Sequence, residues 1–249
     1  MDAHLLLGVA LIGLGVGFLS GAFGKGGSAL ATPLLHAIGV PAIFAIASPL
    51  PATIPSTLIA GRTYARAGNV DRRVLRLGLP IGIPATIAGA LITRWIPGGP
   101  LIVATDVVVL VFGIRILLLR NSIPDNNVER VTTSRVLMVV GIVAFVSSML
   151  GNSGGLLLAP LFISALGLPI HRAFGTSLVL ATCLAIPGTI VHAYLGHIDW
   201  TITLAFGCAA VPAASAGAQL ALRTRARSLT LAYGMGITTL AGGLLALSH

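Results

Sequence analysis

Charged residues are scarce in this chain. Asp, Glu, Lys and Arg make up only 8% of its 249 residues, 56% of the residues are hydrophobic, and lysine occurs once, at Lys25. The mean hydropathy is +1.01. A water-soluble domain of this length carries far more charge on its surface. The composition therefore excludes an ordinary soluble fold and indicates a protein that crosses a membrane several times.

Cysteine and alternating sequence patterns are equally rare. The two cysteines, Cys183 and Cys208, lie in apolar segments without a Cys/His cluster around them, so we interpret them as packing residues and expect neither a disulfide nor a metal site. The long apolar runs do not alternate between polar and apolar residues, which excludes a membrane β-barrel. The N-terminal stretch MDAHLLL lacks the basic residues of a secretory signal and is predicted to remain as a helix.

Long apolar runs occupy most of the chain instead. A helix needs about 20 apolar residues to cross a bilayer, and a helix satisfies its own backbone hydrogen bonds in lipid. Runs near that length predict transmembrane helices at 5–19, 77–93, 101–119, 136–150, 173–191 and 198–222. The run at 156–166 would make a helix of only about 16 Å, which is too short to cross.

The basic residues gather in three regions. Twelve of the fifteen lie at 62–76, 115–135 and 223–227. If these regions share one face of the membrane, the net charge of +9 is the basic excess of cytoplasmic loops and not a nucleic-acid surface. The short run at 156–166 then forms a re-entrant hairpin with the run before it, because a full crossing would move the third basic region to the other side.

The sequence also contains an internal duplication. Offsets of 127 and 128 residues pair Phe18 with Phe145, Gly24 with Gly151, Pro33 with Pro160, Pro41 with Pro169, Gly89 with Gly217, and GNVD at 68–71 with GHID at 196–199. Each copy then holds one hairpin and three full spans, and this odd number of net crossings turns the second copy upside down. Inverted repeats are typical of transporters, whose two halves expose one shared site to either side in turn.

These patterns predict an all-α polytopic membrane protein with two inverted-topology repeats, each a broken or re-entrant helical hairpin plus three transmembrane helices. Residues 1–120 form the first repeat, residues 121–135 a cytoplasmic linker, and residues 136–249 the second repeat, all within one membrane domain. The linker is polar and contains Pro124, Asp125 and Glu129.

Glycine clusters interrupt both hairpins, at 21–28 (GAFGKGGS) and 151–155 (GNSGG). A cluster lets the backbone leave the helix, and the short helix after it presents unpaired N–H groups and the positive end of its dipole to the gap, which suits an anion. The alternative is that the glycines only permit close helix packing, which is our interpretation of the scattered Gly13, Gly15 and Gly17.

The residues around the two breaks resemble those of a known family. The first copy reads GKGGSALATP at 24–33 and the second reads GNSGGLLLAP at 151–160; AFGTSL at 173–178 and YLGHID at 194–199 follow. These motifs resemble the sulfite exporter TauE/SafE family over nearly the whole chain. The resemblance implies a multi-pass carrier in the inner membrane for small sulfur-containing anions such as sulfite or organosulfonates. The first copy departs from the pattern, with Ser48-Pro49 where the second has Thr176-Ser177.

The candidate substrate-binding residues lie at the breaks and in the span after each. They are Gly24, Lys25, Gly26, Gly27, Ser28, Ser48, Gly151, Asn152, Ser153, Gly154, Gly155, Thr176 and Ser177. Lys25 either reaches the lipid headgroups or supplies positive charge to the site. Asp71 and Asp199 are predicted to cap the helices that follow them. We expect no catalytic residue, no cofactor and no metal.

The expected function is export of an anion by a secondary transporter, because an inside-negative potential favours outward movement of negative charge. A proton-coupled importer of a related anion is the alternative. Two other classes stay open: a rhomboid-like intramembrane serine protease, in which His192 would serve as the base for Ser153, and a membrane assembly protein without transport. Expected partners are a small anionic substrate and the lipid bilayer, with a homodimer as a possible assembly and no nucleic acid.

Overall fold

Helices make up almost all of the described chain. The computed structural model describes residues 3–24, 28–97, 132–152 and 154–225, with a few positions between 99 and 107 and at 228. No strand occurs in these residues. In chain order the elements are α1 (Ala3–Phe23), α2 (Ser28–Ala37), α3 (Ala42–Ala47), α4 (Pro49–Arg66), α5 (Arg72–Ile92), the 3-10 helix η1 (Thr93–Trp95), α7 (Thr133–Met149), α8 (Gly155–Ser164), α9 (Ile170–Tyr194) and α10 (Trp200–Arg223).

Five segments of the described chain are long and apolar enough to cross a membrane. They are α1, the α3–α4 segment Ala42–Arg66, the α5–η1 segment Arg72–Trp95, α9 and α10. The expected all-α, polytopic fold is therefore confirmed. Helix α7 is apolar too, with 17 residues, and begins at Thr133, inside the expected linker. Helices α2 and α8 have ten residues each, about 15 Å, so neither crosses a bilayer alone.

The same order of elements occurs twice. Helices α1 and α2 match α7 and α8 at an offset of 127 residues, while α3–α4 and α5 match α9 and α10 at 128. Three pairs of glycines with positive φ recur at these offsets: Gly24 with Gly151, Gly39 with Gly167, and Gly68 with Gly196. The helices of the two copies therefore end and turn at equivalent residues.

The copies differ where the sequence has Ser48-Pro49 in place of Thr176-Ser177. Helix α9 is continuous over 25 residues, whereas the equivalent segment is divided at Ser48 into α3 and α4. Proline has no N–H to donate to the preceding turn, so Pro49 begins a new helix instead of extending α3.

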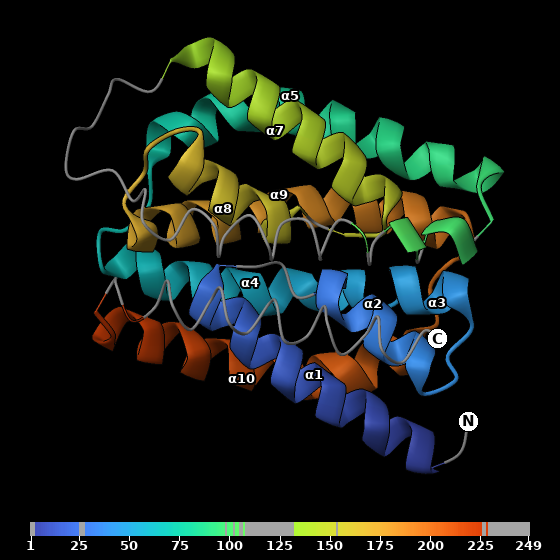
Figure 1. Cartoon of the computed structure of the whole chain (residues 1–249). Coiled ribbons are helices and arrows are strands. Elements are labelled where there is room, and N and C mark those ends of the chain that lie inside the picture. Colours follow the sequence, from blue (N-terminus) through green and yellow to red (C-terminus); the bar gives the residue numbers. More distant parts are fainter. Residues whose placement is uncertain are drawn as a thin grey trace.

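The helices of the two copies are interleaved (Figure 1). Helices α1 and α10 lie side by side along one edge, α5 and α7 lie along the other, and α4 and α9 lie between them with the short helices. Each edge pair therefore joins one helix from each copy.

Glycines let α1 and α10 approach until backbone touches backbone. A Cβ added at Gly13, Gly17 or Gly21 would collide with backbone atoms of Phe206, Ala210 or Ala214 respectively. The interpretation of Gly13 and Gly17 as packing residues is confirmed. For Gly15 the structure gives no such contact, because a Cβ there would meet none of the described residues within 4 Å: Gly15 lies on a different face of α1.

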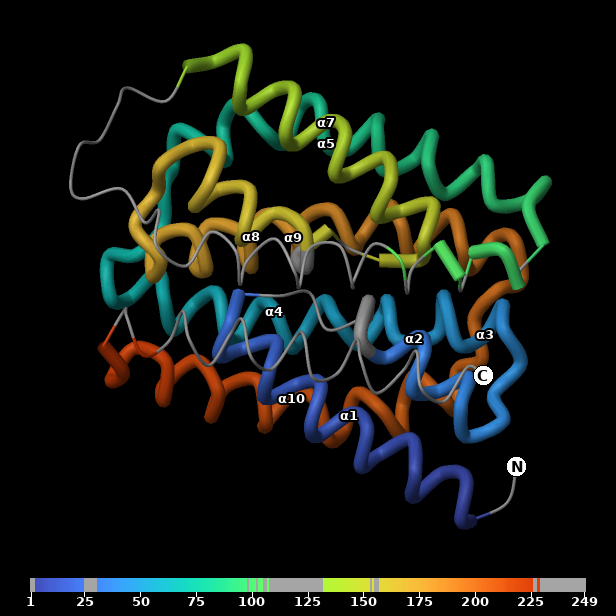
Figure 2. Tube along the Cα trace, viewed as in Figure 1, coloured from blue at the N-terminus to red at the C-terminus, as the bar shows by residue number. Residues whose placement is uncertain are grey.

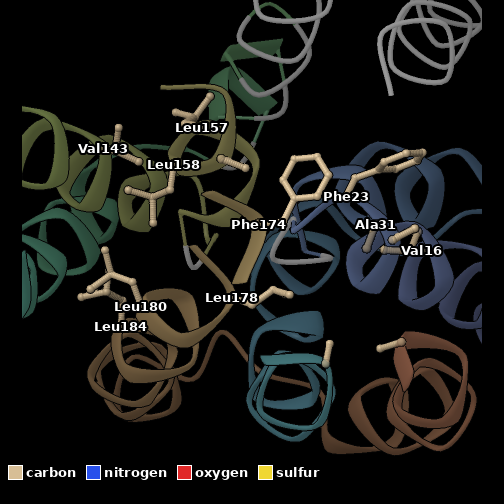
Figure 3. Close-up of a cluster of buried hydrophobic side chains, with 14 of the residues drawn as sticks. Val16, Phe23, Ala31, Val143, Leu157, Leu158, Phe174, Leu178, Leu180 and Leu184 are labelled. Carbon is tan, nitrogen blue, oxygen red and sulfur yellow. The ribbon is translucent and has the colours of Figure 1, made fainter. Parts of the chain in front are cut away.

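Aromatic and aliphatic side chains fill the space between the copies. Figure 3 shows Phe23 of α1 beside Phe174 of α9, and their ring centroids lie 6.5 Å apart in an edge-to-face arrangement. Phe174, Leu178 and Leu184 of α9 are at most 1% exposed. Large apolar side chains on the outer faces of α1, α7 and α9 are exposed instead, for example Leu11 at 62% and Ile190 at 64%, as lipid-facing residues must be.

The two ends of the molecule differ in residue type. Figure 2 shows the α4–α5 turn and the end of α10 at one end, and these segments carry Arg66, Arg72 and Arg223. The opposite end holds the α9–α10 turn, where Tyr194 is 87% exposed and Trp200 56% exposed. Arginine on the cytoplasmic side and aromatic residues at the interface are typical of membrane proteins.

The close packing of α1 against α10 leads to a first testable prediction. Gly17→Ala should destabilise the protein by about 1–3 kcal/mol, because the added methyl group meets the backbone of Ala210, which is held within a helix. Gly15→Ala, two residues away on the same helix, should change the stability by less than about 0.5 kcal/mol. Thermal unfolding in detergent measures both changes. Equal melting temperatures for the two variants would contradict the packing described.

Candidate functional site

The second glycine break is a tight turn between α7 and α8. Helix α7 ends at Met149, and the N–H groups of Gly151 and Asn152 donate to the carbonyls of Ser148 and Ser147, at 3.0 and 2.7 Å. Gly151 has a φ of 62°, the left-handed conformation that commonly ends helices at glycine. The side chain of Asn152 is 5% exposed, so this predicted site residue is inside the protein.

Helix α8 begins after a glycine. Its N-cap is Gly154, with a φ of 84°, and this residue has no side chain that could accept a hydrogen bond from the first turn. Helix α2 begins at Ser28, as expected from the first cluster, after α1 ends at Phe23. Lys25, Gly26, Gly27 and Ser153 lie outside the described residues, and so do the side chains of Ser28 and the first two residues of α8.

One glycine of each break lies against the other copy. A Cβ at Gly24 would collide with the Cα of Phe174, and a Cβ at Gly151 would collide with the backbone of Ile46. Ile46 and Phe174 are themselves equivalent residues, 128 positions apart. Glycine is required at both breaks for two reasons, the positive φ and the close approach of the other copy.

Ser48 and Thr176, two predicted site residues, each hold a backbone amide of the other copy. The N–H of Asp199 donates to Ser48 Oγ at 2.9 Å, and the N–H of Asp71 donates to Thr176 Oγ1 at 2.8 Å. Both pairs are equivalent at an offset of 128 residues. We call these two contacts the reciprocal caps. They join the start of α5 to α9 and the start of α10 to the α3–α4 junction.

The aspartates of the reciprocal caps also cap helices with their side chains, as predicted. Asp71 Oδ1 accepts from the amides of Arg73 and Val74 at the start of α5, and Asp199 Oδ1 accepts from Thr201 and Ile202 at the start of α10. The carboxylates therefore stabilise helix N-termini.

Ser177 is the predicted site residue that contacts the first break. Its hydroxyl lies 2.6 Å from the carbonyl oxygen of Gly24 and 2.9 Å from that of Phe174. The structure thus brings Gly24 and Ser177 together, whereas Ser48 and Thr176 lie at two separate contacts. All three hydroxyls are completely buried and are engaged with backbone groups.

Two buried polar residues that the sequence reasoning did not assign to the site hold the ends of α1 and α7. Tyr64 Oη donates to the carbonyls of Gly21 and Ala22, at 3.3 Å each, and His192 Nε2 lies 3.3 Å from the carbonyl oxygen of Ser148. Tyr64 and His192 are equivalent at 128 residues, and both are 0% exposed. A polar aromatic residue at equivalent places in the two copies is the sequence signal that could have identified them.

His192 is paired with a second histidine. Because Nε2 must carry a proton to donate to the Ser148 carbonyl, neutral His192 has an unprotonated Nδ1, which accepts from Nδ1 of His197 at 3.3 Å. Burial lowers the pKa of His197, which lies in the turn between α9 and α10, and this favours the neutral pair. Both ring nitrogens of His192 are thus engaged, which leaves no free nitrogen to act as a base for Ser153.

One hydroxyl pair links the two central helices. Thr57 of α4 and Thr182 of α9 have their Oγ1 atoms 2.8 Å apart, and both side chains are buried. Each hydroxyl also lies within hydrogen-bond distance of a carbonyl in its own helix, that of Thr53 for Thr57 and that of Leu178 for Thr182. Both hydroxyls at this contact between the two central helices therefore have partners.

These features define a class: a multi-pass, all-helical membrane protein built from two copies of one helical unit, with a glycine break in each. The model of the sulfite exporter TauE/SafE family matches residues 9–244, and the chain belongs to this family.

Relatives agree with this assignment. A protein named "Probable membrane transporter protein" from Xylella fastidiosa strain Temecula1 is 31% identical over 244 residues, which cover 94% of this chain and 92% of the relative. A protein of the same name from Xylella fastidiosa strain 9a5c is 31% identical over 96 residues, covering 38% of this chain and 37% of that protein. No solved structure matches.

The reciprocal caps lead to a second testable prediction. Thr176→Val should lower the free energy of unfolding by about 1–2 kcal/mol, because the Asp71 amide loses its acceptor. Ser48→Ala should have a similar effect through Asp199. Thr176→Ser and Ser48→Thr keep the oxygen and serve as controls. Denaturant or thermal unfolding in detergent is the measurement, and a loss as large in Thr176→Ser as in Thr176→Val would count against the cap.

Proposed function

We propose that this protein is a secondary transporter that exports small sulfur-containing anions, sulfite or organosulfonates, across the inner membrane of a bacterial cell. Membership of the family and the printed name of the longer-matching relative support transport. The observation that carries the choice of an anion is the start of α8, where the N-cap residue is Gly154, which has no side chain to accept from the first-turn amides. Unpaired amides and the positive end of a helix dipole attract negative charge.

The two copies have inverted topology in this proposal. In the view of Figure 2, α1 runs toward the end that holds the α4–α5 turn, whereas its equivalent α7 runs away from that end. Helices α4 and α9, and likewise α5 and α10, also run in opposite senses. The opposite directions of equivalent helices, together with the reciprocal caps, support a pseudo-twofold relation between the copies.

The reciprocal caps suggest how access alternates. The Thr176 cap holds the α4–α5 turn at the arginine-rich end, and the Ser48 cap holds the α9–α10 turn at the aromatic end. Both caps are formed in this structure. Opening one side of the membrane at a time breaks one cap and keeps the other, so that equivalent movements of the two copies expose the site to opposite sides.

Export follows from the membrane potential. Moving one negative charge outward across an inside-negative membrane is favourable by about 2.3 kcal/mol per 100 mV, which supports a gradient of about 50-fold without a coupled ion. The protein is not an enzyme in this proposal, and His192 has a structural role at the end of α7.

Flux through the purified protein tests the function. Vesicles that contain the protein should release radiolabelled sulfite or an organosulfonate down its gradient, and a potential that is negative on the side of the anion should accelerate the release. Empty vesicles give the background, and vesicles with phosphate as the anion test selectivity. If no sulfur-containing anion moves faster than in empty vesicles at any potential, the proposed function is wrong.

Labelling of equivalent residues tests the inversion. Arg66 and Tyr194 are equivalent at 128 residues, exposed, and at helix ends. In a background with Cys183→Ala and Cys208→Ala, Arg66→Cys should react with a membrane-impermeant maleimide only from the cytoplasmic side and Tyr194→Cys only from the outside. Arg225→Cys, at an exposed position after α10, should behave like Arg66→Cys. Reaction of Arg66→Cys and Tyr194→Cys from the same side would exclude inversion.

A further inference from the structure

Three exposed arginines lie together in the first turns of α5. Arg72, Arg73 and Arg76 occupy the first, second and fifth positions of the helix. Residues three and four apart are neighbours on a helix surface, so Arg76 lies beside both of the others. We call these three residues the arginine face. Like charges at this spacing destabilise a helix, so the arrangement favours a partner of opposite charge.

The place of the arginine face within α5 adds to this cost. A helix N-terminus carries the positive end of the macrodipole, which favours acidic residues and disfavours basic ones. The first turn of α5 contains no acidic residue. Arg223, by contrast, lies in the last turn of α10, where the dipole favours a positive charge. At the start of α5 the side-chain charges and the helix dipole therefore act together, and both attract an anion.

The described part of the chain supplies no acidic partner that matches the arginine face. The three arginine side chains form no ion pair with the described residues. Asp71, which precedes α5, is the one acidic residue described at this end, and its Oδ1 accepts from the amides of Arg73 and Val74. Asp199 lies at the opposite end, in the α9–α10 turn. Positive charge thus remains in excess at the start of α5.

An exposed apolar stripe continues along α5 from the arginine face. It consists of Pro80, Ile83, Ile87 and Leu91, and the last three are 38%, 37% and 40% exposed. With about 100° of rotation per residue, the stripe and the arginine face lie within about 100° of arc on one side of the helix. The contact with α7 lies on the other side of α5, and α5 itself lies along an edge of the molecule (Figure 2). The stripe therefore faces lipid.

The length of the helix places the arginine face at the depth of the lipid headgroups. From Arg76 to Trp95, α5 and η1 extend over about 30 Å, which is the thickness of the hydrocarbon core. Trp95 is 69% exposed, and exposed tryptophan is typical of the membrane interface. With Trp95 at one interface, Arg76 lies at the other, and Arg72 and Arg73 lie just outside it. The anion nearest to this surface is a lipid phosphate.

The equivalent surface of the second copy is uncharged. At an offset of 128 residues, the arginine face corresponds to Trp200, Thr201 and Leu204 at the start of α10, which are exposed too. Helix α10 begins in the same way as α5, with Asp199 capping it as Asp71 caps α5. The fold therefore accepts uncharged residues at these positions. Three arginines are not needed to form the helix, so they serve a purpose that only one end of the molecule has.

We propose that the arginine face and the apolar stripe bind an anionic phospholipid, with its phosphate on the guanidinium groups and an acyl chain along the stripe. Guanidinium groups match phosphate oxygens with pairs of parallel hydrogen bonds. The headgroup carries net negative charge, as in phosphatidylglycerol, because a zwitterionic headgroup would bring its own cation against the arginines. The bound lipid holds the α4–α5 turn, which the Thr176 cap also holds, at the membrane surface. The inference does not depend on the substrate that is transported.

Thermal unfolding of the full-length protein in a neutral detergent tests the inference. Phosphatidylglycerol should raise the melting temperature more than phosphatidylcholine with the same acyl chains, because a ligand of the folded state stabilises it. Inorganic phosphate at the same concentration should give no such rise. Arg73→Gln/Arg76→Gln should need about tenfold more phosphatidylglycerol, or a still higher concentration, for half of the rise, because each arginine near the surface contributes to lipid affinity.

A charge-matched variant serves as the control. Arg223→Gln/Arg225→Gln removes the same charge from exposed positions at the same end of the molecule, where α10 ends. It should respond to phosphatidylglycerol within about twofold of the wild type. Without lipid, Arg73→Gln/Arg76→Gln should melt at the wild-type temperature or above it, because it relieves the repulsion between arginines and with the helix dipole. A loss of lipid binding is thereby separated from a loss of folding.

Several results would overturn the inference. An equal rise with phosphatidylcholine would mean that any acyl chain stabilises the protein, and an equal rise with inorganic phosphate would assign the arginine face to a soluble anion. A wild-type response in Arg73→Gln/Arg76→Gln would place the lipid elsewhere. An equally large loss in Arg223→Gln/Arg225→Gln would show that the net charge of this end attracts the lipid, without a site on α5.

Discussion

The need to satisfy backbone polar groups inside a bilayer governs this structure. The helical hairpin of each copy is interrupted by a glycine break. Each break leaves carbonyls free at the end of one helix and amides free at the start of the next. The freed carbonyls receive Tyr64 at the end of α1 and His192 at the end of α7. The N-cap of α8 is Gly154, which has no side chain to accept a hydrogen bond from the first-turn amides. A helix N-terminus of this kind suits an anion.

The two copies complete one another. Amides of Asp71 and Asp199 are held by hydroxyls of the opposite copy, α1 packs on α10, and α5 packs on α7. A single copy would expose its glycine faces and leave these amides without acceptors. The interleaving also explains why Gly24 and Gly151 are glycines, since each is approached by a residue of the opposite copy. Equivalent contacts from both copies therefore hold the structure together.

The sequence predicts the helices and their caps better than it predicts the substrate-binding residues. Apolar runs, basic clusters and the offsets of 127 and 128 residues predict the helices, and Gly-x-x-Asp at 68–71 and 196–199 predicts the caps. The sequence suggested Ser48, Thr176 and Ser177 as substrate ligands, but in the structure their hydroxyls hold backbone groups of other helices. Such partners are distant in sequence, so no local pattern reveals them.

Hydrogen–deuterium exchange at the start of α8 tests most directly whether the anion binds the amides released by the break. With saturating methanesulfonate, the peptide that covers residues 150–158 should exchange more slowly than without it, while the peptide that covers the α9–α10 turn should not change. Identical exchange of residues 150–158 with and without an anion that the protein demonstrably transports would contradict binding at the second break.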